Sequence, residues 1–404
     1  MSYFLDDLTV IDAATFLAGP GAATILADFG ANVIKIEPPE GDGYRGLVGR
    51  YPVPYHWQLT SRNKRSLALD LSKDEGQNVM HRLLAQADVM TTNFMPEQLQ
   101  RYRLNYDVVH ALNPQLIFAH ITGYGDTGPD ANRRAFDVTG WWARSGMMEL
   151  IRDPQQVPLL PAPGMGDHST ATALFGAIMS GLYRRERTGE GCHVSTSLAA
   201  NGVWANGMAI QGVIAGQDMS DRRQKGSWPA PLGACYRCAD ERFIVLAIVN
   251  VAREYPRLCA ALGHEEWLQD ERFATIAAAM QHREVFYAQV CAAFASMPFE
   301  VIAKRLEESG VTYAEAQTMR AVIEDEQLRA NGIIVETTAA AAAAETENDY
   351  PLTVGSPIQI KGEAKRPPSR APDVGADSLA VLRSMDFDDA YIAQLVRDGV
   401  VITQ

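Results

Sequence analysis

The sequence predicts an α/β fold, with a doubly wound parallel sheet followed by a smaller α+β domain. Short apolar runs typical of strands alternate with helical stretches over the first 200 residues. Between residues 201 and 225 a helix of small residues gives way to a charged, polar segment. The final segment, 350–404, is too short for a core of its own, so we expect it to pack on the first domain.

The parallel sheet is predicted by the order of the first three elements. "LTVIDAA" (8–14) has the pattern of a strand, "GPGAATILADFG" (19–30) that of a helix opened by Gly-Pro and closed by Gly30, and "ANVIKIEP" (31–38) that of a second strand. A strand, helix and strand in this order form a βαβ unit, which implies parallel strands and a right-handed crossover.

The same alternation continues along the chain. We expect further strands at 65–72, 88–94, 115–125 and 192–198, and helices at 75–87, 135–151 and 168–187. The predicted domains are a large domain at 1–200, a linker at 201–225, a small domain at 226–322, a linker at 323–349 and a returning segment at 350–404. The small domain should contain a hairpin over 233–249, and the second linker includes the alanine run 339–344.

Composition excludes some classes of partner. The formal net charge is −13 and no block of Lys or Arg is long enough to hold a polyanion, so we expect no nucleic acid. The acidic N-terminus lacks a signal pattern and no apolar stretch reaches membrane-spanning length. The odd number of cysteines, five, favours free thiols in a reducing cytoplasm.

Several cofactor motifs are missing or incomplete. The turn after the first strand, "FLAGPGAAT", lacks the third glycine of a dinucleotide fingerprint, and Pro20 removes a backbone donor. Cys235 and Cys238 form a single Cys-x-x-Cys inside the predicted hairpin, without the second pair of a structural zinc site. The eight histidines show no metal-ligand spacing. We therefore expect no metal and no permanently bound cofactor.

Asp167 is the candidate with the most chemical interest. It lies between the glycine-containing "PGMG" (163–166) and a long, mostly apolar helix. Asp is among the best N-cap residues, so a structural cap explains this position without any activity. A carboxylate beside flexible backbone could equally be a nucleophile whose intermediate is stabilised by backbone N–H groups. The local sequence leaves both interpretations open.

Two stretches are candidates for binding an anionic ligand. "SRNKRS" (61–66) carries Arg62, Lys64 and Arg65, either as a solvated basic turn or as a phosphate clamp. In "NFMPEQLQRYRL" (93–104), Asn93 and Phe94 follow a predicted strand and Arg101 lies on the next helix. Ligands of open parallel sheets bind beyond the carboxyl ends of strands, where these residues fall.

Together these stretches resemble the class III CoA-transferase family, which includes formyl-CoA transferase, carnitine CoA-transferase and α-methylacyl-CoA racemase. The resemblance covers nearly the whole chain in family order. It implies an interlocked homodimer, in which each protomer has a Rossmann-like large domain built from both chain ends and linkers that thread the partner. The matching pieces are 17–42, 61–71, 93–104, 123–129, 165–191 and 326–334.

The resemblance also implies a site. The family's catalytic Asp corresponds to Asp167, and its CoA contacts to Asn93, Phe94 and Arg101, with Lys64 and Arg65 less securely matched. CoA and acyl-CoA would then be substrates, with a carboxylic acid as the second substrate. The Asp167 carboxylate would carry the acyl group as a mixed anhydride and then CoA as a thioester, without a general base because each attacking group is already an anion.

Departures from the family pattern bear on the substrate. The racemase branch places a His where Phe136 stands, so a proton shuttle would lose one arm. Formyl-CoA transferases carry a Gln where Leu17 stands. We expect an acyl pocket that includes Leu17, Phe136, Trp141 and His168, closest to the subgroup acting on phenyllactate, 2-hydroxyisocaproate or bile-acid CoA esters. Transferases for small dicarboxylates, such as succinyl- or mesaconyl-CoA, remain open. A racemase using Asp167 with another base, such as His168, and a non-catalytic CoA-ester binding protein are further alternatives.

Overall fold

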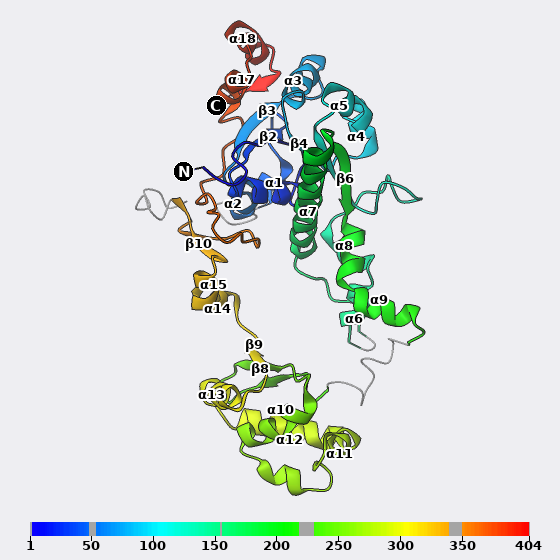
Figure 1. The fold of residues 1–404 in the computed structure, drawn as a ribbon, viewed down its shortest axis with the longest axis vertical. Helices are drawn as coiled ribbons and strands as arrows, with labels where there is room; N and C mark the ends of the chain where they lie inside the picture. Colours follow the sequence, from blue (N-terminus) through cyan, green and yellow to red (C-terminus); the bar gives the residue numbers. More distant parts are fainter. Residues whose placement is uncertain (1, 48–53, 154–155, 218–229, 339–349, 404) are drawn as a thin grey trace. The chain divides into compact units, whose positions relative to one another are not determined.

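The computed structural model describes residues 2–47, 54–153, 156–217, 230–338 and 350–403. These residues divide into two compact units, each described here by itself (Figure 1). The larger unit combines residues 1–152, 157–211 and 329–404, and the smaller combines 153–156 with 212–328. The predicted alanine run lies outside the described residues.

A seven-stranded sheet forms the centre of the larger unit, and its six parallel strands confirm the predicted parallel sheet. Its strand order is β12-β3-β2-β1-β4-β5-β6. This order reverses between β1 and β4, the arrangement in which open α/β sheets bind ligands beyond the strand ends. The parallel strands are β1 (Thr9–Asp12), β2 (Asn32–Glu37), β3 (Arg65–Leu69), β4 (Val89–Thr92), β5 (Ile117–Thr122) and β6 (Cys192–Ser197).

The seventh strand comes from the C-terminal segment. No strand was predicted at the end of the chain. β12 (Val401–Ile402) pairs antiparallel with β3 and closes one edge of the sheet. The helices α17 (Ser378–Ser384) and α18 (Asp389–Arg397) precede it, and α17 packs beside β3 (Figure 1). The returning segment therefore adds a strand to the large sheet, and it also supplies helices to the larger unit.

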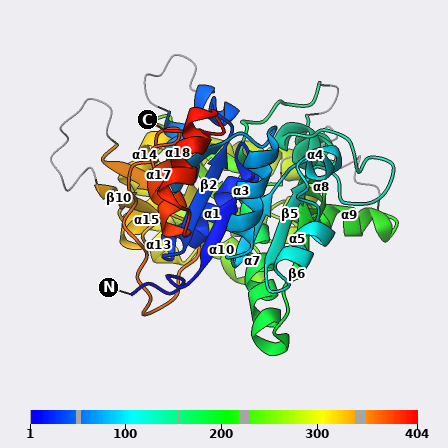
Figure 2. The same ribbon diagram turned by 90° about the horizontal axis from the view of Figure 1, so that it is seen from above.

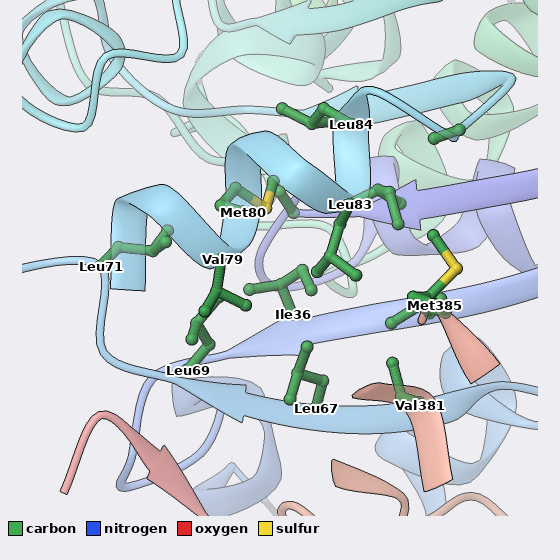
Figure 3. Packing of buried hydrophobic residues seen from close by; sticks show 14 of the residues in the cluster. Ile36, Leu67, Leu69, Leu71, Val79, Met80, Leu83, Leu84, Val381 and Met385 are labelled. Atoms are coloured by element: carbon green, nitrogen blue, oxygen red, sulfur yellow. The ribbon is translucent and has the colours of Figure 1, made fainter. Parts of the chain in front are cut away.

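Each face of the sheet is covered by its own set of helices. Successive buried residues of a strand therefore belong alternately to the cores on the two faces. Val10, Val33 and Val89 pack against α1 (Ala18–Asp28) and α7 (Met165–Thr188). Their neighbours Ile11, Ile34 and Met90 belong to the opposite core, with side chains from α3 (Asp74–Leu84), α4 (Pro96–Arg101), α5 (Tyr106–Leu112), α17 and α18 (Figure 2). Figure 3 shows part of this core, where Leu83 of α3 and Val381 of α17 lie near Ile36 of β2. This alternation is the strand period of two in a sheet buried on both sides.

The expected single helix over 135–151 is wrong. The chain forms a short π-helix, Val138–Ala143, then reaches Gly146 with φ +76°, and only then forms α6 (Met147–Ile151). A residue in the left-handed region ends an α-helical hydrogen-bond ladder, so one periodic stretch becomes two short elements. The remaining elements of this unit are η1 (Gly43–Gly46), α2 (Tyr55–Ser61), α8 (Leu198–Ala205), β10 (Ile334–Glu336) and β11 (Leu352–Val354), while α9 (Gly207–Ile214) crosses the boundary between the units.

The smaller unit has a three-stranded antiparallel sheet beside a set of helices. Its strand order is β7-β8-β9, and the expected hairpin is formed by β7 and β8. Tyr236 and Phe294 stack in its core with ring centroids 4.6 Å apart. The elements are β7 (Cys235–Arg237), β8 (Phe243–Leu246), β9 (Tyr313–Glu315), α10 (Val251–Leu262), η4 (Glu265–Gln269), α11 (Ile276–Gln281), α12 (Arg283–Ala295), α13 (Phe299–Ser309) and α14 (Met319–Glu324), while α15 (Glu326–Ala330) crosses the boundary between units.

A search of the described helices finds none that by itself has the length and hydropathy needed to cross a bilayer. Taken together, α12 and α13 have the required length and hydropathy, but the pair is bent by 117°. All five cysteines are free thiols.

Candidate active site

A cavity of about 480 Å³ opens within the larger unit beyond the carboxyl ends of β1 and β4. This is the point at which the strand order reverses, and the volume lies within the range of small-molecule sites. The cavity brings together six of the residues singled out from the sequence, namely Leu17, Asn93, Phe94, Phe136, Asp167 and His168.

Asn93 joins the two strands that flank the reversal point. Its Oδ1 accepts a hydrogen bond from the Thr15 N–H at 2.9 Å, and its Nδ2 donates to the Thr15 carbonyl at 2.9 Å. These paired bonds fix the loop after β1 against the loop after β4. The neighbouring Phe94 packs edge-on against Tyr102, with ring centroids 5.5 Å apart, and also lines the cavity.

Asp167 lies in the first turn of α7, and its proposed role as N-cap is wrong. Gly164 occupies the N-cap position, and Asp167 is the third residue of the helix that begins at Met165. The capping carboxylate comes instead from Asp137, which accepts hydrogen bonds from the N–H groups of Gly164 at 2.6 Å and Gly166 at 3.1 Å. Capping by another segment leaves the Asp167 carboxylate directed to the cavity.

The close approach of Asp137 requires glycine at position 166. A Cβ built there would lie 2.3 Å from Oδ1 of Asp137 and 2.4 Å from Cγ of Trp141. Gly166, the last residue of "PGMG", is thus fitted between a capping carboxylate and an indole, and this geometry explains a glycine next to Asp167.

The environment raises the pKa of Asp167 to about 7. Burial of the carboxylate is the largest cause, and the nearby Asp137 charge adds to it. Burial also raises the pKa of Asp137, but its two backbone hydrogen bonds favour the ionised form. Two carboxylates with different surroundings and one strongly perturbed pKa are typical of a catalytic site.

The cations of 61–66 have internal partners. Nζ of Lys64 lies 2.8 Å from Oδ2 of Asp12 and donates to the Pro20 carbonyl at 2.7 Å. Arg62 forms two hydrogen bonds to Asp28, at 2.7 and 3.1 Å. Both side chains are buried, and Lys64 does not line the cavity. The structure therefore gives Lys64 a place in a buried ion pair.

Three other residues singled out from the sequence also lie outside the cavity lining. Arg65 stands at the amino end of β3, and its guanidinium contacts Asn32 and Ser384. Arg101 is exposed at the end of α4, the helix that begins at the cavity-lining Pro96. Trp141 is buried behind Gly166.

Sequence reasoning missed several residues that the structure places at the cavity. Asp137 had no predicted role, because its contact with the start of α7 joins residues 27 positions apart in the chain. Tyr44, His56 and Arg133 also line the cavity. The Tyr44 hydroxyl has a raised pKa, first because it is buried and second because Asp167 is near. Arg133 supplies a cation that no strand-end pattern indicated.

Fold and site together define an α/β protein with a carboxylate of raised pKa at its switch-point cavity. The chain belongs to CoA-transferase family III, whose model matches residues 5–378. It is therefore a CoA-transferase, an enzyme class whose substrates are CoA thioesters.

Named relatives and a solved structure agree with this assignment. The chain is 29% identical to a (R)-2-hydroxy-4-methylpentanoate CoA-transferase of Clostridioides difficile over 98% of this chain and 99% of the relative. It is also 29% identical to a cinnamoyl-CoA:phenyllactate CoA-transferase of Clostridium sporogenes, over 98% and 96%. A CAIB/BAIF family protein from Brucella suis has the same fold, with a TM-score of 0.83 and 28% identity over 96% of this chain and 100% of that chain.

Proposed function

We propose that the protein transfers CoA from an acyl-CoA thioester to a free carboxylic acid, with Asp167 as the covalent carrier. The observation that carries this proposal is the position of Asp167 in one cavity with Asn93 and Phe94, beyond the strand ends. Its carboxylate has a pKa of about 7, so a large fraction is ionised at neutral pH while it remains more basic than an ordinary Asp.

The reaction begins with attack of an Asp167 oxygen on the thioester carbonyl carbon. The C–S bond breaks, CoA thiolate leaves, and an aspartyl mixed anhydride remains. The thiolate then attacks the aspartyl carbonyl, forming an aspartyl-CoA thioester and releasing the donor carboxylate. Both attacking groups are anions, so neither step needs a general base. Oxyanion stabilisation at the start of α7 would fall to backbone N–H groups other than those of Gly164 and Gly166, which already donate to Asp137.

The second half repeats these steps with the acceptor. The acceptor carboxylate attacks the aspartyl-CoA carbonyl and displaces CoA thiolate, which gives a new mixed anhydride. The thiolate attacks the acceptor carbonyl of this anhydride, forms the product thioester and frees the Asp167 carboxylate. Water would hydrolyse either anhydride, so a partly buried carboxylate in an apolar cavity favours transfer over hydrolysis.

Asn93 and Phe94 are proposed as CoA-binding residues, with Arg101 beyond them. Phe94 offers a ring for stacking on the adenine, and Arg101 is an exposed cation on the helix that follows. Lys64 and Arg65 are weaker candidates, because their charged groups already have partners within the chain. Leu17, Phe136 and His168 are proposed to line the acyl pocket, and Trp141 to support it from behind.

The names of the two clostridial relatives support an apolar 2-hydroxy acid as a substrate class. An interlocked homodimer is also part of the proposal. Its support is a group of exposed apolar side chains on α8 and α9, which a second copy of the chain would cover. These are Trp204 at 87% and Met208 at 94% exposure, both in the larger unit.

A trapping experiment tests the carrier role. The protein is mixed with acyl-CoA and hydroxylamine, and peptides are examined by mass spectrometry for a hydroxamate at position 167. Asp167→Ala should form no hydroxamate and should lose several orders of magnitude of CoA transfer while it remains folded. Normal transfer by this variant would overturn the proposal. Exchange of α-deuterium without CoA exchange would favour a racemase, and binding without either exchange a non-catalytic protein.

A further inference from the structure

Three potential metal ligands meet outside the catalytic cavity. They are His120 on β5, His193 on β6 and Asp126 in the loop after β5. One ligand atom from each lies within 4.8 Å of the other two. No sequence spacing indicates this cluster, because it depends on the pairing of two strands more than seventy residues apart.

The parallel pairing of β5 and β6 places both imidazoles on one face of the sheet. His120 is aligned with Ser195, and Phe118 with His193, so these four side chains point to the same side. The two imidazole centroids lie 6.1 Å apart. Asp126 reaches this face from the loop, where its carboxylate forms an ion pair with the ring of His120.

The protonation of His120 is constrained by its contacts. Its Nε2 lies 3.0 Å from the carbonyl oxygen of Phe94, an acceptor only, so Nε2 carries a proton and donates it. Its Nδ1 faces Oδ1 of Asp126 at 3.3 Å. Nδ1 is therefore the ring nitrogen of His120 that is left for a ligand on the side of Asp126.

The geometry points to a binding site for one divalent transition-metal ion of the zinc type, with Nδ1 of His120, a carboxylate oxygen of Asp126 and a ring nitrogen of His193 as ligands. Two imidazoles and one carboxylate form an established zinc ligand set that leaves a fourth position open. The hydrogen bond from the other nitrogen of His120 to a backbone carbonyl is the outer contact that usually orients a metal-bound imidazole.

The three ligands can close around such an ion. Zinc ligands stand about 2.0–2.1 Å from the metal, so neighbouring ligand atoms in a tetrahedral site are about 3.4 Å apart. The pair of His120 and Asp126 already meets this separation at 3.3 Å. His193 and Asp126 are exposed, and side-chain rotation can bring them closer, while His120 is buried and fixed.

A bound ion would link β5, β6 and the intervening loop next to the proposed CoA site. It would also fix the ring that donates to the Phe94 carbonyl, whose residue lines the cavity. The inference does not depend on the proposed transfer reaction, because the cluster lies outside the cavity lining and its occupancy is measured by binding.

The test uses the full, untagged protein after treatment with a chelator. It is titrated with Co²⁺ alone, and the visible absorption of the bound ion is followed before Zn²⁺ is added as competitor. We expect one equivalent of Co²⁺ with the absorption of a four- or five-coordinate site, displaced by Zn²⁺. His193→Gln and Asp126→Asn should each weaken binding by at least roughly tenfold. Both side chains are exposed, and circular dichroism establishes that the variants fold.

Two control variants exclude other sites. His282→Gln alters an exposed histidine at the start of α12, and Cys235→Ser removes the exposed thiol of the Cys-x-x-Cys pair. Both should bind Co²⁺ like the unaltered protein. The inference is overturned if one equivalent does not bind, if binding is unchanged in both cluster variants, or if it is lost in Cys235→Ser. In each of these cases His120 and Asp126 form an ordinary ion pair.

Discussion

Asp137 supplies the capping carboxylate for the helix that carries Asp167, and its charge also raises the Asp167 pKa. One side chain thus fixes where the reactive carboxylate lies and adds to its basicity. The two effects can be separated, because position depends on two backbone hydrogen bonds and basicity depends on charge as well as burial.

The first prediction separates these effects with Asp137→Asn. The amide oxygen can still accept one N–H, but the charge is lost, so the pKa of Asp167 should fall toward its ordinary value. Because transfer requires the ionised carboxylate, the acid limb of kcat/KM for acyl-CoA should move from near pH 7 to lower pH. Asp107→Asn, on the exposed side of α5, is the matched control. An unchanged acid limb in Asp137→Asn would contradict the tuning role.

The second prediction concerns stability and pH. The folded-state pKa of Asp167 is raised, so the folded protein binds a proton more tightly than the unfolded chain between about pH 4 and pH 7. This carboxylate therefore lowers stability progressively as pH rises through that window. Asp167→Asn removes the effect, so the variant should gain about 2–4 °C in Tm at pH 8, the shift produced by ~1 kcal/mol in a large domain, and little at pH 4. A gain at pH 4 that matches the gain at pH 8 would refute this account.

The third prediction uses two glycines of the same helix. Gly166→Ala should displace Asp137 or Trp141, because its Cβ would lie 2.3 Å from one and 2.4 Å from the other. We expect a loss of about 1–3 kcal/mol in the free energy of unfolding, as for other overpacked sites, and a fall in transfer activity. Gly176→Ala is the control, since a Cβ there meets nothing within 4 Å. It should be neutral or stabilising by up to ~1 kcal/mol in urea denaturation.

The sequence indicated the site residues that follow the strands. It did not indicate the residues that distant segments bring next to one another. Asn93 and Phe94 follow an apolar run, and parallel strands present their carboxyl ends at one edge, so local pattern places them at the cavity. The cap of α7 comes from Asp137, which no local pattern of that helix contains. His120 and His193 meet through strand register, which spacing along the chain does not encode.

The basic stretch 61–66 shows a second limit of local pattern. Its three cations suggest a phosphate clamp, yet Lys64 reaches Asp12, a partner 52 residues away on a buried strand. A run of basic residues shows that cations are present. The function of these cations depends on which anions the fold brings near them. The helix expected over 135–151 differed for a related reason, since its apolar periodicity continues through the left-handed turn at Gly146.

The fourth prediction tests the structural role of Lys64. Lys64→Met removes one partner of a buried ion pair and leaves the Asp12 carboxylate with less compensating positive charge. The free energy of unfolding should therefore fall by about 3–5 kcal/mol. Lys304→Met, at a mostly exposed lysine, should change it by less than ~0.5 kcal/mol. Folded Lys64→Met protein should keep its KM for acyl-CoA. A raised KM with unchanged stability would instead restore Lys64 as a phosphate ligand.

The fifth prediction concerns Phe94, whose ring is proposed to stack on the adenine of CoA. Removing an aromatic platform costs about 1–3 kcal/mol per stacked base, so Phe94→Ala should raise the KM for acyl-CoA by roughly 5- to 150-fold. The carrier carboxylate is untouched, so kcat at saturating acyl-CoA should change far less. Tyr183→Ala, which removes an exposed ring from α7, is the control and should leave both constants unchanged. A Phe94→Ala enzyme with normal KM and reduced kcat would show that the ring serves the acyl-transfer step, because lost stacking acts on binding in the ground state and in the transition state alike.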